Sequence, residues 1–367
     1  MGKTSRILIG LFFCCCTYFV SANPVPNPSL NNIPDSSDKI KEFHNIYPDK
    51  YPRGSFIKWQ FERLFYRSHK DSDDVAPSTG PNLELIHHPG RNVIVTWIGH
   101  STLIYQCDGI TFLTDPIFSD YASPLPPLGP KRHVPPGVSI KQLPHIDVVL
   151  ISHNHYDHLD LPSVRALANQ AGGPPLFLVP MNVRKWFLNN IEVMNTPDNT
   201  KKVIEFNWNK SISVPGKTNN FDITFLSVHH WSARSLWDRD ETLWGSWAIV
   251  HPEFKFWFSG DLGYSKDSID IGNRFQGFDL AAIDIGAYKP RWFMANYHLN
   301  PQEAVQVMKD VRAKQAIGIH WGVFKLSDEP FLQPPVDLKN ALDIEHIDNN
   351  KFIVLKIGES KVYKEIN

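Results

Sequence analysis

Short apolar runs that end at turn residues recur along the chain from about residue 92 onward. They are rich in β-branched and aromatic residues, a composition typical of β-strands. Strands are predicted at 93–98, 102–107, 111–113, 146–151, 223–228, 254–258 and 316–319. The run 146–151 is apolar at nearly every position, as expected for a strand that is buried on both faces.

Apolar residues at helical spacing predict helices at 161–170 and 301–314, the second with a proline in its first turn. No repeat or low-complexity block is visible, and no linker divides residues 90–360. The 29 prolines and 12% aromatic residues favour a loop-rich α/β or β-containing globule over a helical bundle. We therefore expect residues 91–367 to form one domain.

The N-terminus has the pattern of a targeting segment. Lys3 and Arg6 precede an uncharged apolar stretch over 7–20, which ends in the small-residue sequence Val20-Ser21-Ala22. This arrangement predicts a secretory signal peptide over 1–22, with an uncleaved signal anchor as the alternative. The protein is then expected to be exported, to a periplasm, a secretory lumen or the extracellular space.

Two further segments separate this signal from the main domain. Residues 23–38 are rich in Pro, Asn and Ser, which predicts a linker. Residues 39–90 are predicted to be a helical extension, in which Ser55 caps a helix over 56–65. Its apolar residues cover a wide face, so this helix either packs on the core or lies in a membrane interface.

Charge and cysteine content limit the partners and the metal ligands that are expected of the chain. With 37 Lys and Arg against 38 Asp and Glu, the formal charge is −1, which excludes nucleic-acid binding through a bulk positive field. Three of the four cysteines lie inside the predicted signal, so the mature chain keeps only Cys107, a predicted buried structural thiol. In an oxidising compartment, His and Asp are safer metal ligands than isolated thiolates.

The densest chemistry lies directly after the predicted strand 146–151. Three histidines and an aspartate fall within six residues, at His153, His155, Asp157 and His158. Packing explains such a cluster poorly, because a buried imidazole still needs hydrogen-bond partners. Imidazole and carboxylate without thiolate suit zinc or a similar ion. In a turn after a strand, His153 and His155 can share one metal while Asp157 and His158 serve another.

Two metals need more ligands than this motif supplies. Further candidates each follow a predicted strand, and these are His229 with His230, Asp261 and His320. All of them can therefore gather at one edge of a sheet, where sites of α/β proteins usually lie. Asp261 can bridge two ions.

In this order, the motif and the later ligands resemble the metallo-β-lactamase superfamily. Longer segments resemble its N-acylphosphatidylethanolamine-hydrolysing phospholipase D family or the bacterial outer-membrane-type relatives of that family. These segments are 96–102, 112–118, 129–132, 149–160, 243–247, 285–288, 290–294 and 319–322. The resemblance implies an αββα sandwich with two zinc ions between the sheets. It also implies hydrolysis to phosphatidic acid and an N-acylethanolamine by a metal-bridged hydroxide.

Carried over residue by residue, the resemblance divides the ligands between two zinc ions. It assigns His153, His155 and His230 to one zinc, and Asp157, His158 and His320 to the other, with Asp261 as the bridge. His230 is preferred to His229 because the family's ligand directly precedes a tryptophan, here Trp231.

Three more residues match family motifs. His298 corresponds to a histidine near the substrate phosphate, although it can also be a residue that flanks a helix. Asp157, Asp261 and His298 are therefore the catalytic candidates. His100 and Asp115 are expected to support the site rather than to bind metal.

Other features bear on the substrate and partners. Two zinc ions, two carboxylates and a bridging hydroxide leave a site charge of about +1, which favours an anionic diester. Lys131, Arg132 and Arg291 are candidates for attracting lipid headgroups, or alternatively for structural ion pairs. The apolar loop 125–128 departs from familiar animal members and can face a bilayer. A membrane phospholipid substrate and peripheral membrane contact are expected, and homodimers are common in the family.

Other functions stay open on the sequence alone. The same two-metal site can serve another hydrolase of the superfamily, such as a lactonase, a β-lactamase-like amidase or a different phosphodiesterase. A protein that keeps the fold but has lost catalysis is a third interpretation. The complete ligand set argues against it, because decay usually removes a ligand first.

Overall fold

The computed structural model describes residues 42–66 and 75–366. The predicted signal peptide and linker, over 1–22 and 23–38, lie outside these residues and stay predictions. The described residues belong to one compact unit. Within the described part, no helix is long and apolar enough to cross a membrane.

One sheet contains the first six strands and the last. Its order is β14 (Ser360–Glu365), β1 (Asn92–Gly99), β2 (Thr102–Cys107), β3 (Ile110–Thr114), β4 (Val148–Leu150), β5 (Leu176–Pro180) and β6 (Val203–Phe206). The pairs from β14 to β3 are antiparallel, and those from β3 to β6 are parallel. Strand β4 is central to the parallel half and completely buried, as its apolar run predicts.

The second sheet contains the other seven strands. Its order is β13 (Phe352–Ile353), β12 (Ala313–Ile319), β11 (Phe278–Asp284), β10 (Phe254–Phe258), β9 (Ser246–His251), β8 (Asn220–Leu226) and β7 (Ser211–Pro215). Strands β10 to β13 are parallel, and β7 to β10 are antiparallel. Each sheet therefore joins a parallel half to an antiparallel half.

The two sheets pack face to face through aromatic residues. Tyr105 of β2 stacks on Phe256 of β10 with ring centroids 4.6 Å apart. Phe112 of β3 meets the edge of Phe221 of β8 at 5.2 Å. Such large side chains supply most of the apolar area that the sandwich buries. Cys107 is buried in β2 as expected, and burial raises the pKa of its thiol to about 12.

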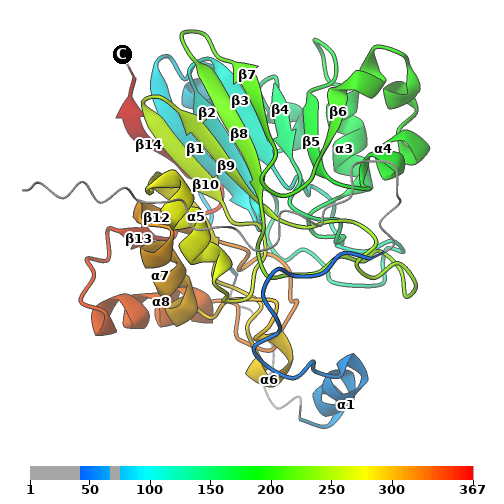
Figure 1. The fold of residues 1–367 in the computed structure, drawn as a ribbon, viewed down its shortest axis with the longest axis vertical. Helices are drawn as coiled ribbons and strands as arrows, with labels where there is room; N and C mark the ends of the chain where they lie inside the picture. The colour runs from blue at the N-terminus through cyan, green and yellow to red at the C-terminus, as the bar shows by residue number, and fades with distance from the viewer. Residues whose placement is uncertain (1–41, 67–74, 367) are drawn as a thin grey trace, which may run out of the picture. The chain divides into compact units, whose positions relative to one another are not determined.

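Helices cover the outer faces of both sheets (Figure 1). Helices α3 (Leu161–Ala168) and α4 (Arg184–Asn190) lie beside β4 to β6, where their apolar residues form a second core. Helices α5 (Asp267–Phe275), α7 (Pro301–Asp310) and α8 (Gln333–Ile344) lie beside the parallel half of the second sheet. The remaining helices are α1 (Phe56–Tyr66), α2 (Leu83–His87) and α6 (Arg291–Met294). The predicted αββα sandwich is confirmed.

The ends of two helices can be compared with the predictions from the local sequence pattern. The predicted helix over 301–314 is too long, because α7 ends at Asp310 and β12 begins at Ala313. Arg312 between them has φ +56°, and β12 pairs with β11 from its first residue. At the N-terminal side, the Lys58 backbone N–H donates to Ser55 Oγ at 3.2 Å, so Ser55 caps α1 as predicted. In α1, Trp59 is buried and stacks on Phe293, whereas Phe61 is exposed.

Candidate metal centre

The histidine-rich turn over 153–158 directly follows β4 at the edge of the first sheet. His153 and His158 are buried, and His155 and Asp157 are partly buried. Backbone hydrogen bonds from His158 and Leu159 to the His155 carbonyl close the turn. The turn therefore holds several metal-binding side chains in a fixed arrangement before any ion is considered.

Three imidazoles form the first cluster. The ligand atoms of His153, His155 and His230 lie within 4.8 Å of one another. The His230 Nδ1–H donates to the Tyr297 carbonyl at 2.9 Å, which leaves Nε2 with a lone pair. Nε2 of His155 and of His230 is buried without a hydrogen-bond partner. Buried nitrogens without partners are costly unless they bind an ion.

Asp157, His158 and His320 form the second cluster. Asp157 Oδ2 lies 3.4 Å from Nε2 of both His158 and His320. Both Nε2 atoms are buried without a hydrogen-bond partner, as in the first cluster. Each cluster thus offers three nitrogen or oxygen ligands, of which two imidazole Nε2 atoms have no hydrogen-bond partner in the protein.

Asp261 lies between the two clusters. Its Oδ2 is 3.1 Å from His158 Nε2 and 3.2 Å from His320 Nε2. The same oxygen is 3.8 Å from Nε2 of His153 and of His230. Its other oxygen is buried and accepts no hydrogen bond. This is the position that a ligand shared by two ions would take.

The ligands come from both sheets. The turn 153–158 follows β4 of the first sheet, whereas His230, Asp261 and His320 follow β8, β10 and β12 of the second. The expectation from strand patterns, a single sheet edge, is therefore wrong. The strands that precede the candidate ligands belong to two different sheets. The site therefore lies where the ends of the two sheets meet. His229, the alternative to His230, instead approaches Asp49 at 3.0 Å.

Backbone conformation at the site is unusual. His100, Asp115 and His320 have φ angles of 54°, 31° and 61°, a region that residues other than glycine seldom adopt. Gly260, which precedes the bridging candidate Asp261, has φ +58°. A Cβ at Gly260 would lie 2.7 Å from Ser152 Cβ, so the two ligand loops meet there in a close contact that requires glycine.

Charge in the site is balanced between imidazoles and carboxylates. Burial lowers the pKa of His155 to about 4, so its ring is neutral and available as a ligand near neutral pH. Burial acts to raise the pKa of Asp261, but His158 and His320 hold it well below its usual range. Despite burial, Asp261 raises the pKa of His158 and of His320 well above the ordinary value. A divalent cation fits this set of donors and carboxylates.

Asp115 and His100 each contact a residue of the second cluster. His158 Nδ1 lies 2.7 Å from Asp115 Oδ2, and His100 Nε2 lies 3.0 Å from Asp157 Oδ2. Metal-binding imidazoles usually donate their second N–H to a carboxylate in this way. Asp115 and His100 therefore orient ligands.

Comparison with known proteins identifies the family. The Beta-lactamase superfamily domain matches residues 111–321. The N-acyl-phosphatidylethanolamine-hydrolyzing phospholipase D 1 of Caenorhabditis elegans is 38% identical over 276 residues, which cover 74% of this chain and 76% of that protein. The chain belongs to the N-acylphosphatidylethanolamine-hydrolysing phospholipase D family. As a member of this family, it is a metal-dependent hydrolase.

Two further comparisons concern the family and the fold. The mitochondrial N-acyl-phosphatidylethanolamine-hydrolyzing phospholipase D of Saccharomyces cerevisiae is 36% identical over 247 residues, which cover 66% of this chain and 50% of that protein. A metallo hydrolase of Ignicoccus hospitalis has a similar structure, with a TM-score of 0.52 at 18% identity over 74% of this chain and 99% of that one. This second likeness shows the fold alone.

His298, the remaining catalytic candidate of this family member, lies at the solvent edge of the site. Its side chain is 14% exposed, and its ring stacks on His320 with centroids 5.1 Å apart. Its Nδ1 lies 3.1 Å from Asp284 Oδ2. Sequence reasoning missed Asp284, although a carboxylate that directly follows the apolar run 280–283 is a signal that could have found it.

The basic candidates differ in their contacts. Arg132 is buried, and its guanidinium donates to the carbonyls of Ile117 and Ser119. Arg291 pairs with Glu303 at 2.7 Å, as the structural alternative expects. Lys131 is exposed.

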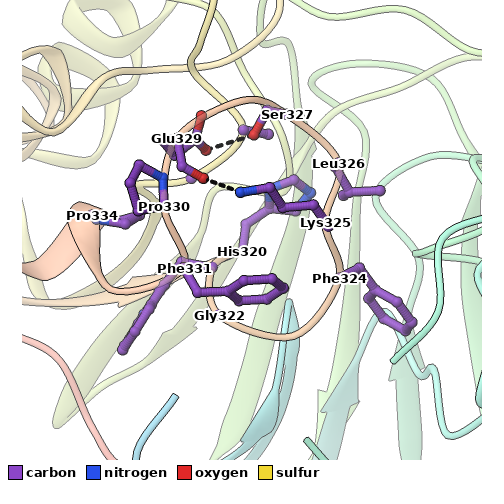
Figure 2. A pocket seen from close by; sticks show the side chains of 13 residues that line it. His320, Gly322, Phe324, Lys325, Leu326, Ser327, Glu329, Pro330, Phe331 and Pro334 are labelled. Carbon is purple, nitrogen blue, oxygen red and sulfur yellow. Dashed lines mark hydrogen bonds between the residues drawn. The ribbon is translucent and has the colours of Figure 1, made fainter. Parts of the chain in front are cut away.

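A small pocket lies beside His320 (Figure 2). The loop 322–334 surrounds it, and the rings of Phe324 and Phe331 form part of its wall. Lys325 Nζ donates to the Glu329 carbonyl at 2.5 Å. The Glu329 carboxylate accepts from Ser327 Oγ at 2.6 Å. The pocket therefore combines two aromatic rings with polar groups that are hydrogen-bonded to one another, next to the second cluster.

Proposed function

We propose that the chain is a zinc-dependent phospholipase D that hydrolyses N-acylphosphatidylethanolamine to phosphatidic acid and an N-acylethanolamine. The observation that carries the proposal is the pair of ligand clusters joined by Asp261, in a chain 38% identical to a relative named for this reaction. Histidine and aspartate donors without a thiolate favour zinc.

The bound ions, the two aspartates and His298 have different roles in this reaction. Two bound ions would supply Lewis-acid stabilisation of the phosphoryl oxygens and a water that ionises near neutral pH. Asp261 and Asp157 balance the charge of the site and fix the spacing of the clusters. His298, at the solvent edge, is placed to assist departure of the leaving oxygen, by accepting a proton from the attacking water and passing it to that oxygen.

Peripheral contact with a membrane is part of the proposal, since the substrate is a bilayer lipid. Leu236 and Trp237 are 88% and 85% exposed in the loop that follows His230 and Trp231. Arg234 anchors that loop to the metal site by donating to the Asn154 and Leu159 carbonyls at 2.7 and 2.8 Å. An exposed Leu–Trp pair on a fixed loop suits insertion at a lipid interface.

A second exposed apolar pair lies in the apolar loop 125–128. Leu125 and Leu128 are 67% and 68% exposed. This loop follows Ser119, whose hydroxyl donates to Asp160 Oδ2 at 2.8 Å, next to the histidine-rich turn. Export and assembly into a homodimer belong to the same proposal, on the N-terminal pattern and the family resemblance.

The test is turnover by the zinc-loaded full chain of N-acylphosphatidylethanolamine in mixed micelles, read by mass spectrometry. A His155→Ala variant, prepared and loaded identically, is the control. We expect phosphatidic acid and N-acylethanolamine from the wild type and neither from the variant. No turnover by a chain that carries zinc would refute the proposal and favour a lactonase or another phosphodiesterase, to be screened with lactone and diester panels.

A further inference from the structure

Asp284 is a buried carboxylate that lies between two histidines of the site. It is the last residue of β11 and has no exposed surface. Its Oδ2 is 3.1 Å from His298 Nδ1, and its Oδ1 is 3.5 Å from His320 Nδ1. One carboxylate therefore faces a candidate metal ligand and the candidate that meets the substrate.

The two carboxylate oxygens of Asp284 have different hydrogen-bond partners. The Gly286 backbone N–H donates to Asp284 Oδ1 at 2.9 Å. Oδ2 is left to accept from His298, and a carboxylate oxygen accepts only. His298 Nδ1 must therefore carry the hydrogen. The nearest other carboxylate oxygen, Oδ2 of Asp261, is 4.0 Å from Nδ1 and beyond hydrogen-bond distance.

The backbone of His298 is fixed separately. Arg291 Nη1 donates to the His298 carbonyl at 2.9 Å, while Arg291 Nη2 pairs with Glu303. The preceding Tyr297 carbonyl accepts from His230. With the backbone held, Asp284 is the contact that sets the rotation and the tautomer of the His298 ring.

We propose that Asp284 is a positioning residue that holds His298 with Nδ1–H turned inward, so that the lone pair of Nε2 is free to take up a proton from the attacking water and pass it to the leaving oxygen. The inference rests on the proposed function, since it concerns how His298 meets the substrate. Asp284 acts through His298 and does not touch the reacting atoms.

An amide at this position should disturb His298 selectively. In Asp284→Asn, the amide oxygen can still accept from Gly286 and face His320, as Oδ1 does in the wild type. The NH2 group then faces His298 Nδ1, and a donor there favours the opposite tautomer. We therefore expect Asp284→Asn to retain metal and to move the His298 hydrogen to Nε2.

Nuclear magnetic resonance of ¹⁵N-histidine-labelled, zinc-loaded protein tests the tautomer directly. Long-range ¹H–¹⁵N correlations distinguish Nδ1–H from Nε2–H, and the His298→Ala spectrum assigns the signal. We expect Nδ1–H in the wild type and Nε2–H in Asp284→Asn. The opposite tautomer in the wild type would overturn the inference, and this result is independent of the substrate.

Kinetics at saturating zinc test the consequence. We expect Asp284→Asn to lower kcat about 100-fold, with a change in KM within about threefold, as for an interaction made only in the transition state. In a His298→Ala background, Asp284→Asn should lower kcat little further, because Asp284 acts only through the His298 ring. Asp267→Asn, the same change at a buried aspartate held by Ser227 and Ser265, is the control and should keep wild-type kcat.

Further outcomes distinguish an error in this inference from a variant that does not fold and from failure of the proposed function. A loss of activity that tracks a loss of bound zinc would mean that Asp284 acts through His320, and would overturn the inference. Additive effects of the two variants would do the same. If Asp284→Asn does not fold, Asp284→Glu keeps the charge, and it should retain the Nδ1–H signal and part of kcat. Absence of wild-type turnover refutes the proposed function, whereas the tautomer result still decides the inference.

Discussion

His158 and Asp115 form a pair that is completely buried, with His158 Nδ1 2.7 Å from Asp115 Oδ2. The backbone N–H and hydroxyl of Ser152 also donate to Asp115, at 2.7 and 2.5 Å. The carboxylate is thus fixed by the residue that directly precedes the histidine-rich turn. It holds the imidazole with Nδ1–H inward and Nε2 toward Asp261, as a metal ligand requires.

Asp115→Asn should therefore weaken metal binding without removing a ligand. Loss of such a supporting carboxylate typically lowers metal affinity about 10- to 100-fold. Competition with a chromophoric chelator measures the affinity. The control is Asp147→Asn, because Asp147 accepts from the Thr111 backbone N–H in the same sheet but lies outside the clusters. Equal affinities for Asp115→Asn and the wild type would refute this role.

Sequence alone predicted which residues the structure gathers in the two clusters, because each follows an apolar strand. The contiguous turn from His153 to His158 carries the strongest signal, and His230, Asp261 and His320 follow from it. What failed was the placement on one sheet, because strand pairing depends on partners far away in the chain. Arg132 shows the same limit, since nothing in its neighbourhood says that its charge is buried against backbone carbonyls.

Metal removal should destabilise the fold. Without an ion, the buried Nε2 atoms of His155 and His230 and an oxygen of Asp261 have no partner. An ion at 100 times its dissociation constant stabilises the folded state by about 2.7 kcal/mol. We expect chelation to lower the melting temperature by about 4 °C for each ion that is lost, as measured by differential scanning fluorimetry. Zinc should restore it.

The same measurement on His320→Ala gives the control. This variant lacks a ligand of the second cluster, so its melting temperature should respond less to chelator and to added zinc. A wild-type chain with equal melting temperatures in both states, at measured full and zero zinc content, would argue against a metal centre in these clusters.

Asp108 predicts a pH dependence of stability away from the site. Its carboxylate, in the turn between β2 and β3, accepts from Thr218 and Asn219 in the turn between β7 and β8, each at 2.9 Å. Burial acts to raise the pKa of Asp108, but these hydrogen bonds lower it below the ordinary value of 3.8. The folded-state pKa is therefore below the unfolded one, so its stabilisation is complete above pH 3.8 and is lost as pH falls through the folded value.

Asp108→Asn should accordingly cost about 1–3 kcal/mol of unfolding free energy at pH 7, and less as the pH falls below about 4. Urea unfolding at a series of pH values measures the difference between variant and wild type. Asp222→Asn, at an exposed position of β8, should show no such difference. A difference between Asp108→Asn and the wild type that grows on acidification would contradict a lowered pKa in the folded state.

The exposed Leu236 and Trp237 give a prediction about the membrane. Each side chain that enters a bilayer interface contributes up to about 1.5–3 kcal/mol. Leu236→Asp and Trp237→Asp should each reduce binding to phosphatidylcholine vesicles that contain phosphatidylglycerol, by about tenfold in the partition coefficient. Co-sedimentation measures this loss, and the tryptophan emission of the wild type should shift to shorter wavelength on binding.

Ile344→Asp is the matched control, because Ile344 is 66% exposed at the end of α8 and outside this loop. A general loss of exposed apolar surface would weaken binding equally in all three variants, whereas a specific loop contact spares Ile344→Asp. Turnover of a short-chain, monomeric substrate should stay near the wild-type rate in the loop variants, since neither side chain belongs to the clusters. Vesicle binding that is unchanged in both loop variants would assign the membrane contact to another surface, such as the loop with Leu125 and Leu128.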